Sequence, residues 1–260
     1  MITGLVNALA AGEDAAQPRL HLLGSAYLTH GGGNCSMAES STRLLAFLAL
    51  NWGENDRRYV AERLWPDVDY ARAAGNLRSS LWRLNALGMV LVESSKTSVR
   101  LCGNVTVDVR LLGDWAARMI SGTPGPEDLI HGPWDLDRLE LLPGRSDDWI
   151  LLDRERFRQR ILHALEILGE RLIGAGRCAE AVEVALVAAN ADLLRESAAR
   201  VLIAAHLAEG NRAEASRRYA EHRALVHAEL GVEPSPQLAA LFGPSRQRAA
   251  GATRGSTLPH

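Results

Sequence analysis

The stretch YARAAGNLRSSLWRLNALG, from Tyr70 to Gly88, decides the fold because it predicts an amphipathic helix. On a wheel of about 100° per residue, its apolar side chains fall within about 40° of Leu77. This apolar stripe consists of Ala73, Leu77, Leu81 and Leu84. Asp67 or Asp69 can cap the N-terminus, and Gly88 suits the left-handed position past the C-terminus. We therefore expect a helix that is seated by its leucines and turns a polar face outward.

The outward face of this helix has the chemistry of a DNA-reading surface. Arg72, Asn76, Ser79 and Arg83 form one polar strip, and Arg78 lies on its flank. Arginine and asparagine suit bidentate hydrogen bonds to guanine and adenine edges, and serine can bond bases or phosphates. We predict that the strip reads base edges and that Arg78 binds a phosphate. An ordinary solvated helix face remains the alternative. Trp82 lies outside the apolar stripe; it either packs against the following hairpin or contacts a partner, and we favour packing.

The segments before this helix predict one strand and two short helices. RLHLLGSAYLT, at residues 19–29, has the pattern of a strand that enters a hairpin at HGGGN. Ser36 and Glu39 have the spacing of a capping box before an apolar helix that stops at Gly53. Asp56 can cap a second helix, which Pro66 ends. The order of strand and helices up to Tyr70 is therefore compact, with tight turns.

The segment after the helix completes a recognisable arrangement. VLVESSKTSVRL predicts a hairpin whose arms, Val90–Val92 and Val99–Leu101, flank a polar turn. Strand, three helices and hairpin in this order make a winged helix-turn-helix, in which the third helix reads DNA and the hairpin is the wing. Lys96 and Arg100 would then bond phosphates or enter the minor groove, unless they belong to an ordinary charged turn.

The second half of the chain predicts a helical repeat. Residues 148–230 read as almost wholly helical, and GRCAEA at 176–181 recurs as GNRAEA at 210–215, 34 residues later. That interval is the period of a tetratricopeptide repeat, in which each Gly closes one helix and each AEA opens the next. Chance similarity between alanine-rich helices is the alternative. We expect Asp147 and Asp148 to cap the helix that begins DWILLD.

These patterns divide the chain into five parts. We expect a flexible leader at 1–17, a winged helix-turn-helix domain at 18–105, a connecting helix and loop at 106–145, a helical domain at 146–241 and a flexible tail at 242–260. The expected fold class is mainly α with a small β component, a winged helix-turn-helix followed by an all-α tetratricopeptide-like repeat domain.

Composition describes a soluble globular protein with one local excess of positive charge. The net charge of −2 argues against a protein that coats nucleic acid along its whole surface. Between Ala71 and Arg100, however, five basic residues accompany one acidic residue, Glu93. The apolar runs are too short to span a membrane, and the three widely spaced cysteines suggest neither a disulfide framework nor a zinc site, which fits the cytoplasm.

Motifs for catalysis are missing from the sequence. It has no GxxxxGK[ST], no GxGxxG after a strand, no HExxH and no GxSxG. We therefore expect no enzymatic activity, no cofactor and no metal.

The residues also resemble a known family. ERLWP, LRSSLWRLN and the closing AELGVEPSPQL, within a match over about residues 19–241, are similar to the SARP family of bacterial transcriptional regulators. The resemblance implies an OmpR-like winged helix joined to a bacterial transcriptional activation domain. It also implies binding to repeated operator sites in double-stranded promoter DNA of antibiotic and other secondary-metabolite clusters, possible self-association there, recruitment of RNA polymerase holoenzyme, and a place at the nucleoid. Many relatives have Trp where Arg145 stands, which leaves that local domain contact open.

Two other functions stay open at this stage. Residues 1–120 contain 12 basic and 11 acidic side chains, a balance that also suits a helical-repeat interaction module with a degenerate winged helix. A repressor has the same fold as an activator, because the fold does not fix the sign of regulation.

Overall fold

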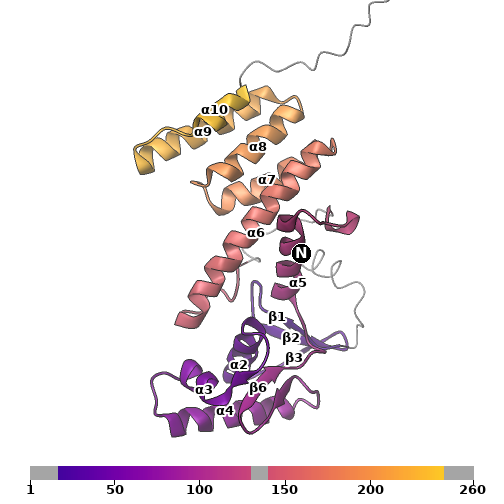
Figure 1. Ribbon diagram of the computed structural model, residues 1–260, viewed down its shortest axis with the longest axis vertical. Helices are drawn as coiled ribbons and strands as arrows, with labels where there is room; N and C mark the ends of the chain where they lie inside the picture. Colours follow the sequence, from indigo (N-terminus) through magenta and orange to yellow (C-terminus); the bar gives the residue numbers. More distant parts are fainter. Residues whose placement is uncertain (1–16, 130–139, 243–260) are drawn as a thin grey trace, which may run out of the picture.

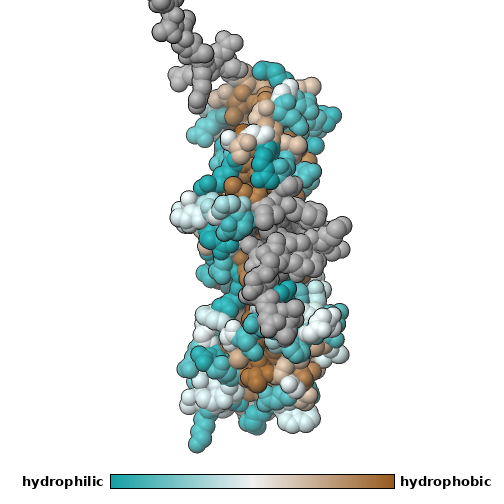
Figure 2. Space-filling model, turned by 90° about the vertical axis from the view of Figure 1, so that its right-hand side faces the viewer, coloured by the Kyte–Doolittle hydropathy of each residue, from teal (hydrophilic) through white to brown (hydrophobic). Residues whose placement is uncertain are grey.

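The computed structural model describes residues 17–129 and 140–242. Figure 1 shows an elongated molecule with helix α4 at one end and helices α9 and α10 at the other. The surface seen in Figure 2 is mainly hydrophilic, and hydrophobic residues show in small areas along its length. The expected leader and tail lie outside the described residues, apart from residues 17 and 242.

The first sheet has the strand order β3-β2-β1-β7. Its strands are β1 (Arg19–His21), β2 (Tyr27–His30), β3 (Gly33–Cys35) and β7 (Thr106–Val107), which pairs in parallel with β1. The expectation of one strand over 19–29 is wrong, because the chain turns at Gly24, where φ is 75°, and returns as β2. The N–H groups of Leu22 and Leu23 instead donate to the carboxylate of Asp108, at 3.0 and 3.1 Å.

Three helices follow the sheet. Helix α2 (Glu39–Leu50) begins after Ala38, without a side-chain cap, so the expected capping box at Ser36 is wrong. Helix α3 (Arg57–Leu64) is capped by Asp56, whose carboxylate accepts two backbone N–H groups, as predicted. Helix α4 (Tyr70–Asn85) is capped by Asp69. Gly88 follows α4 with a φ of 74°, which also confirms the prediction.

The expected hairpin forms the second sheet. Strands β5 (Val92–Ser94) and β6 (Ser98–Leu101) are antiparallel, and β4 (Asn55–Asp56) pairs with the other side of β6. The first arm begins two residues later than the pattern indicated. Arg57 at the start of α3 donates to Ser94 Oγ and to the carbonyl of Ser95, at 2.5 and 3.1 Å. The hairpin turn is therefore fixed against the helix-turn-helix.

The second half of the chain is helical, as the sequence predicts. It comprises α5 (Asp108–Ser121), η1 (Pro126–Leu129), α6 (Asp148–Gly174), α7 (Cys178–Ala191), α8 (Glu196–Ala208), α9 (Arg212–Leu230), α10 (Pro236–Ala239) and η3 (Ala240–Phe242). Helices α6 to α9 pack on one another in chain order. Gly176 and Gly210, with φ of 76° and 87°, precede α7 and α9, which confirms the helix boundaries expected from the repeat.

A close helix contact supports the repeat packing. A Cβ at Gly169 of α6 would lie 2.7 Å from Cγ1 of Val201 on α8, so only glycine fits there without a shift. One buried core continues from Leu20 of the first sheet to Ala205 of α8. None of the helices in the two described ranges combines the length and apolar character that a membrane-spanning segment requires. The mainly α fold, a winged helix-turn-helix followed by a helical repeat, is confirmed.

Candidate nucleic-acid interface

Helix α4 buries the predicted apolar stripe. Ala73, Leu77 and Leu84 are 1% exposed, and Leu81 is 9% exposed. Ser80 is also fully buried, which the sequence pattern missed, and its carbonyl accepts a hydrogen bond from Ser41 Oγ of α2 at 3.4 Å. Because α2 and α3 both pack on α4, the opposite face of α4 points outward at the end of the molecule (Figure 1).

Most of the predicted reading strip is free of internal partners. Arg72, Arg78 and Ser79 are exposed, and Asn76 is half-buried. Within the part of the chain that the structure describes, none of these four side chains has a hydrogen bond or ion pair; Arg72 uses only its backbone N–H, which donates to Asp69. Their donors are therefore available to an external acceptor.

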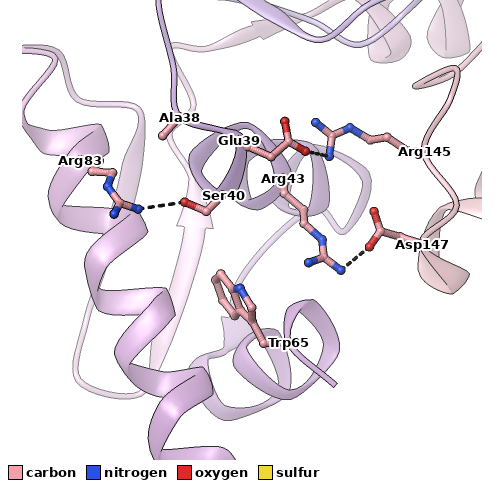
Figure 3. Close-up of a pocket in the computed structure, with 8 residues that line it drawn as sticks. All are labelled: Ala38, Glu39, Ser40, Arg43, Trp65, Arg83, Arg145 and Asp147. Carbon is pink, nitrogen blue, oxygen red and sulfur yellow. Dashed lines mark hydrogen bonds and ion pairs between the residues drawn. The ribbon is translucent and has the colours of Figure 1, made fainter. Parts of the chain in front are cut away.

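Arg83, the last residue of the strip, differs from the others. Its guanidinium donates to Ser40 Oγ of α2 at 3.0 Å, so it leans toward the first helix (Figure 3). The structure therefore brings together Arg72, Asn76 and Ser79 as free groups, and holds Arg83 at one edge.

The two wing residues also differ from each other. Lys96 is exposed at the hairpin turn, without a partner among the described residues. Arg100 hydrogen-bonds Glu93 through Nε and Nη2, at 2.9 and 2.5 Å. This hydrogen bond from Arg100 holds the pKa of Glu93 below its usual value. Lys96 thus keeps a free positive charge, whereas that of Arg100 is largely compensated.

Trp82 corrects one expectation from the sequence. The indole is 72% exposed and does not pack against the hairpin. The cause lies in the helix register, because Trp82 projects from the outer side of α4, away from the stripe that faces the core.

A polar cleft of about 670 Å³ lies beside α4, where the two halves of the molecule meet. Figure 3 shows that its side chains come from the first turns of α2 and the residue before it, the end of α3, α4 and the segment before α6. The cleft is lined by Ala38, Glu39, Ser40, Arg43, Trp65, Arg83, Arg145 and Asp147. It therefore contains three arginines and two carboxylates.

Two ion pairs of opposite polarity cross this cleft. Arg43 of α2 pairs with Asp147, and Glu39 of α2 pairs with Arg145 at 2.7 Å. We call these four residues the interdomain clasp. Asp147 is the N-cap residue of α6 and Asp148 lies in its first turn, as expected, but the Asp147 carboxylate makes no cap hydrogen bond and bonds Arg43 instead. The contact of Arg145, which the sequence left open, is thus with Glu39.

An aromatic contact also joins α2 to α6, close in sequence to the clasp residues Arg43 and Asp147. Phe47 of α2 meets Trp149 of α6 edge to face, with ring centroids 5.1 Å apart and an interplanar angle of 73°. Phe47 is 1% exposed and Trp149 is 7% exposed. The helix-turn-helix and α6 are therefore joined by a buried aromatic contact and by the two ion pairs of the clasp.

The described residues offer no grouping for metal chemistry and no disulfide. Within residues 17–129 and 140–242, no three His, Cys, Asp or Glu side chains are grouped so that they could hold a metal ion. The three cysteines are free thiols.

The comparisons with known proteins agree with this architecture. The family model described as "Bacterial transcriptional activator domain" matches residues 134–243. The chain is 28% identical over 236 residues to "Regulatory protein AfsR" of Streptomyces coelicolor, covering 87% of this chain and 24% of the relative. It is 36% identical over 112 residues to the protein of the same name from Streptomyces griseus, covering 43% of this chain and 11% of that protein. The chain thus spans about a quarter, or less, of the length of these relatives.

A solved structure shares the fold. Mycobacterium tuberculosis EmbR, solved in complex with a low-affinity phosphopeptide, superposes with a TM-score of 0.69. The alignment covers 86% of this chain and 64% of that chain, at 19% sequence identity. At this identity the likeness concerns the fold alone.

Proposed function

Because the chain belongs to the SARP family of bacterial transcriptional regulators, we propose that it binds specific double-stranded promoter DNA through α4 and the hairpin wing. The observation that supports this most strongly is the outer face of α4. Arg72, Asn76, Arg78 and Ser79 are side chains suited to bases and phosphates, and they lack partners within the described residues. In helix-turn-helix proteins, the recognition helix presents such side chains to base edges in the major groove.

Each side chain has a proposed role on the DNA. Arg72, Asn76 and Ser79 face base edges in the major groove, while Arg78 and Lys96 bond phosphates. Arg83 and Arg100 can bind DNA only if they give up their internal hydrogen bonds, to Ser40 and Glu93 respectively. Since such an exchange replaces one hydrogen bond by another, these two residues contribute less net affinity than Arg72.

The helical domain supplies the regulatory output in this proposal. The protein activates transcription by contacting RNA polymerase holoenzyme, after binding repeated operator sites on which copies lie side by side. We propose that the promoters belong to antibiotic or other secondary-metabolite clusters, and that the protein acts at the nucleoid in the cytoplasm. Two Streptomyces regulatory proteins among the relatives support a bacterial promoter as the target.

The test is a mobility-shift titration on a DNA duplex that the native protein selects from a random library. Arg72→Ala should weaken binding by about 1 to 3 kcal/mol and relax one base position. Arg212→Ala is the matched control, because Arg212 is also exposed but lies on α9, far from α4 in Figure 1. Failure to select any sequence, or equal binding by the Arg72 variant, would contradict the proposed reading face.

A salt titration separates DNA reading from protein docking, the second candidate function. That candidate is favoured by the ion pair between Arg100 and Glu93, which reduces the free positive charge of the wing. True DNA binding weakens steeply as salt rises, since bound counterions are released from the phosphates. A flat response would favour docking. Transcription with purified RNA polymerase holoenzyme then distinguishes an activator from a repressor.

A further inference from the structure

Trp82 is the most exposed large hydrophobic side chain of residues 17–129 and 140–242, at 72%. A tryptophan in water keeps a large apolar area hydrated, and tryptophan is enriched among the residues that dominate binding interfaces. Among the described residues, the other tryptophan of comparable exposure is Trp52, at 57%. Trp52 has an internal partner, because Arg110 stacks over its ring. Trp82 has no ring contact within the described residues.

The position of Trp82 on α4 points to its partner. On the helical wheel, Trp82 lies about 140° from Leu77, between Arg78 at about 100° and Ser79 at about 200°. The indole therefore stands in the middle of the exposed arc, with positive charge on both of its sides. Gly75 and Ala86, at about 160° and 180°, are small and leave the indole projecting beyond the helix surface.

A partner for this face must be apolar at its centre and must offer hydrogen-bond acceptors at both edges. The major groove of DNA meets both conditions, because phosphates for Arg78 and base-edge acceptors for Arg72 lie on either side of the C5-methyl groups of thymine. Resting on the proposed function, we infer that Trp82 is a specificity-determining residue that contacts thymine C5-methyl groups at the operator. A purely apolar protein surface would leave Arg72 and Arg78 without acceptors.

The experiment removes the methyl group without changing base pairing. The duplex selected by the native protein is resynthesised with each thymine replaced in turn by uracil, and the dissociation constant of the full chain is measured for each. Losing one buried methyl should weaken native binding about fourfold at one or two adjacent positions. Trp82→Ala should bind the unmodified duplex more weakly and show no uracil effect at those positions. Trp52→Ala, the matched control, should keep the native uracil profile.

The outcomes separate this inference from the function on which it rests. If the native protein selects no DNA, the proposed function fails and the inference fails with it. If native protein and Trp82→Ala bind equally and share one uracil profile, the inference is overturned while DNA binding stands. A weaker Trp82→Ala variant with the native uracil profile also overturns it, and would place the indole on the DNA backbone. Circular dichroism of each variant confirms that the fold is retained.

Discussion

The outer face of α4 and the interdomain clasp both contain arginines, yet their chemistry is opposite. Arg72 and Arg78 on α4 have no side-chain partner among the described residues, whereas Arg43 and Arg145 in the clasp are each paired with a carboxylate from the other half of the molecule. Arg83 lies between the two groups and bonds Ser40. The difference teaches that the pairing of arginines, more than their number, separates those available to an external anion from those that join domains.

The two tryptophans that belong to these regions give the largest expected contrast. Trp149 is 7% exposed and contacts Phe47, so Trp149→Ala should lower the free energy of unfolding by about 3 to 5 kcal/mol. Trp82→Ala should change it by less than about 0.5 kcal/mol, since the indole is exposed. Urea denaturation followed by circular dichroism measures both. Similar losses of unfolding free energy in the two variants would contradict the assignment of Trp149 to the core and Trp82 to the free surface.

Within the clasp, the two ion pairs should differ in strength. The side chains of Arg43 and Asp147 are 24% and 16% exposed, so Asp147→Asn should cost about 1 to 2 kcal/mol of unfolding free energy by leaving a largely buried cation. Glu39 is 78% exposed, and Glu39→Gln should cost at most about 0.5 kcal/mol. The same denaturation measurement ranks the two variants. A larger loss from Glu39→Gln would reverse our assignment of the stronger pair.

Asp108 adds a third case to the comparison, because it is a buried carboxylate without an ion pair among the described residues. Its carboxylate accepts the backbone N–H groups of Leu22, Leu23 and Val109, and burial raises its pKa to about 6. A raised folded-state pKa means that the folded protein binds the proton more tightly than the unfolded chain, so this group favours folding more as pH falls from 7 toward 4. Relative to Asp108→Asn, the native protein should gain about 1.3 kcal/mol between pH 7 and pH 5.

Denaturation of both proteins at the two pH values measures this difference, and the subtraction cancels the other carboxylates. A constant difference, or a loss on acidification, would mean that the backbone hydrogen bonds outweigh burial and keep Asp108 charged.

The smallest expected effect concerns the flank of α4. Arg78 is exposed and unpaired in the described structure, so Arg78→Ala should change unfolding free energy by less than about 0.5 kcal/mol. On the selected DNA, the same variant should weaken binding to all sequences alike and reduce the salt slope by about one. Titrations at several salt concentrations provide the slope. Altered sequence preference in the variant would instead assign Arg78 to a base.

Local sequence signals predicted much of this structure. The stripe through Leu77 and the caps at Asp56 and Asp69 depend on neighbours a few residues apart, so periodicity and capping chemistry reveal them. The helical repeat is revealed by similar sequence at a fixed interval of 34 residues. The end of the first strand, which the sequence pattern placed too late, depends on Asp108. The carboxylate of Asp108 accepts the N–H of Leu22, 86 residues away in sequence. No local pattern contains that bond.

The candidate site was predicted in type but not in detail. The wheel identified the outward face of α4, yet the partners of Arg83 and Asp147 lie 43 and 104 residues away in sequence. Arg100 pairs with Glu93, seven residues away on the neighbouring strand, and the hairpin register gives Arg100 and Glu93 as directly opposite residues. A cross-strand reading of the sequence could have found that pair. Trp82 lies off the core stripe, a position that suits either packing against the hairpin or contact with a partner, and its exposed fraction of 72% contradicts the favoured packing.

Because helix α6 is long, a small rotation at the clasp produces a large displacement at its far end. It runs for 27 residues from Asp148, next to the clasp, to Gly174 in the helical repeat, a length of about 40 Å at 1.5 Å per residue. A tilt of roughly 10° at its first turn would carry its far end through about 7 Å. A small change in the orientation of α6 at Asp147 would thus displace α7 to α10 by a large distance. Two ion pairs and one aromatic contact therefore fix the position of the helical repeat relative to the helix-turn-helix.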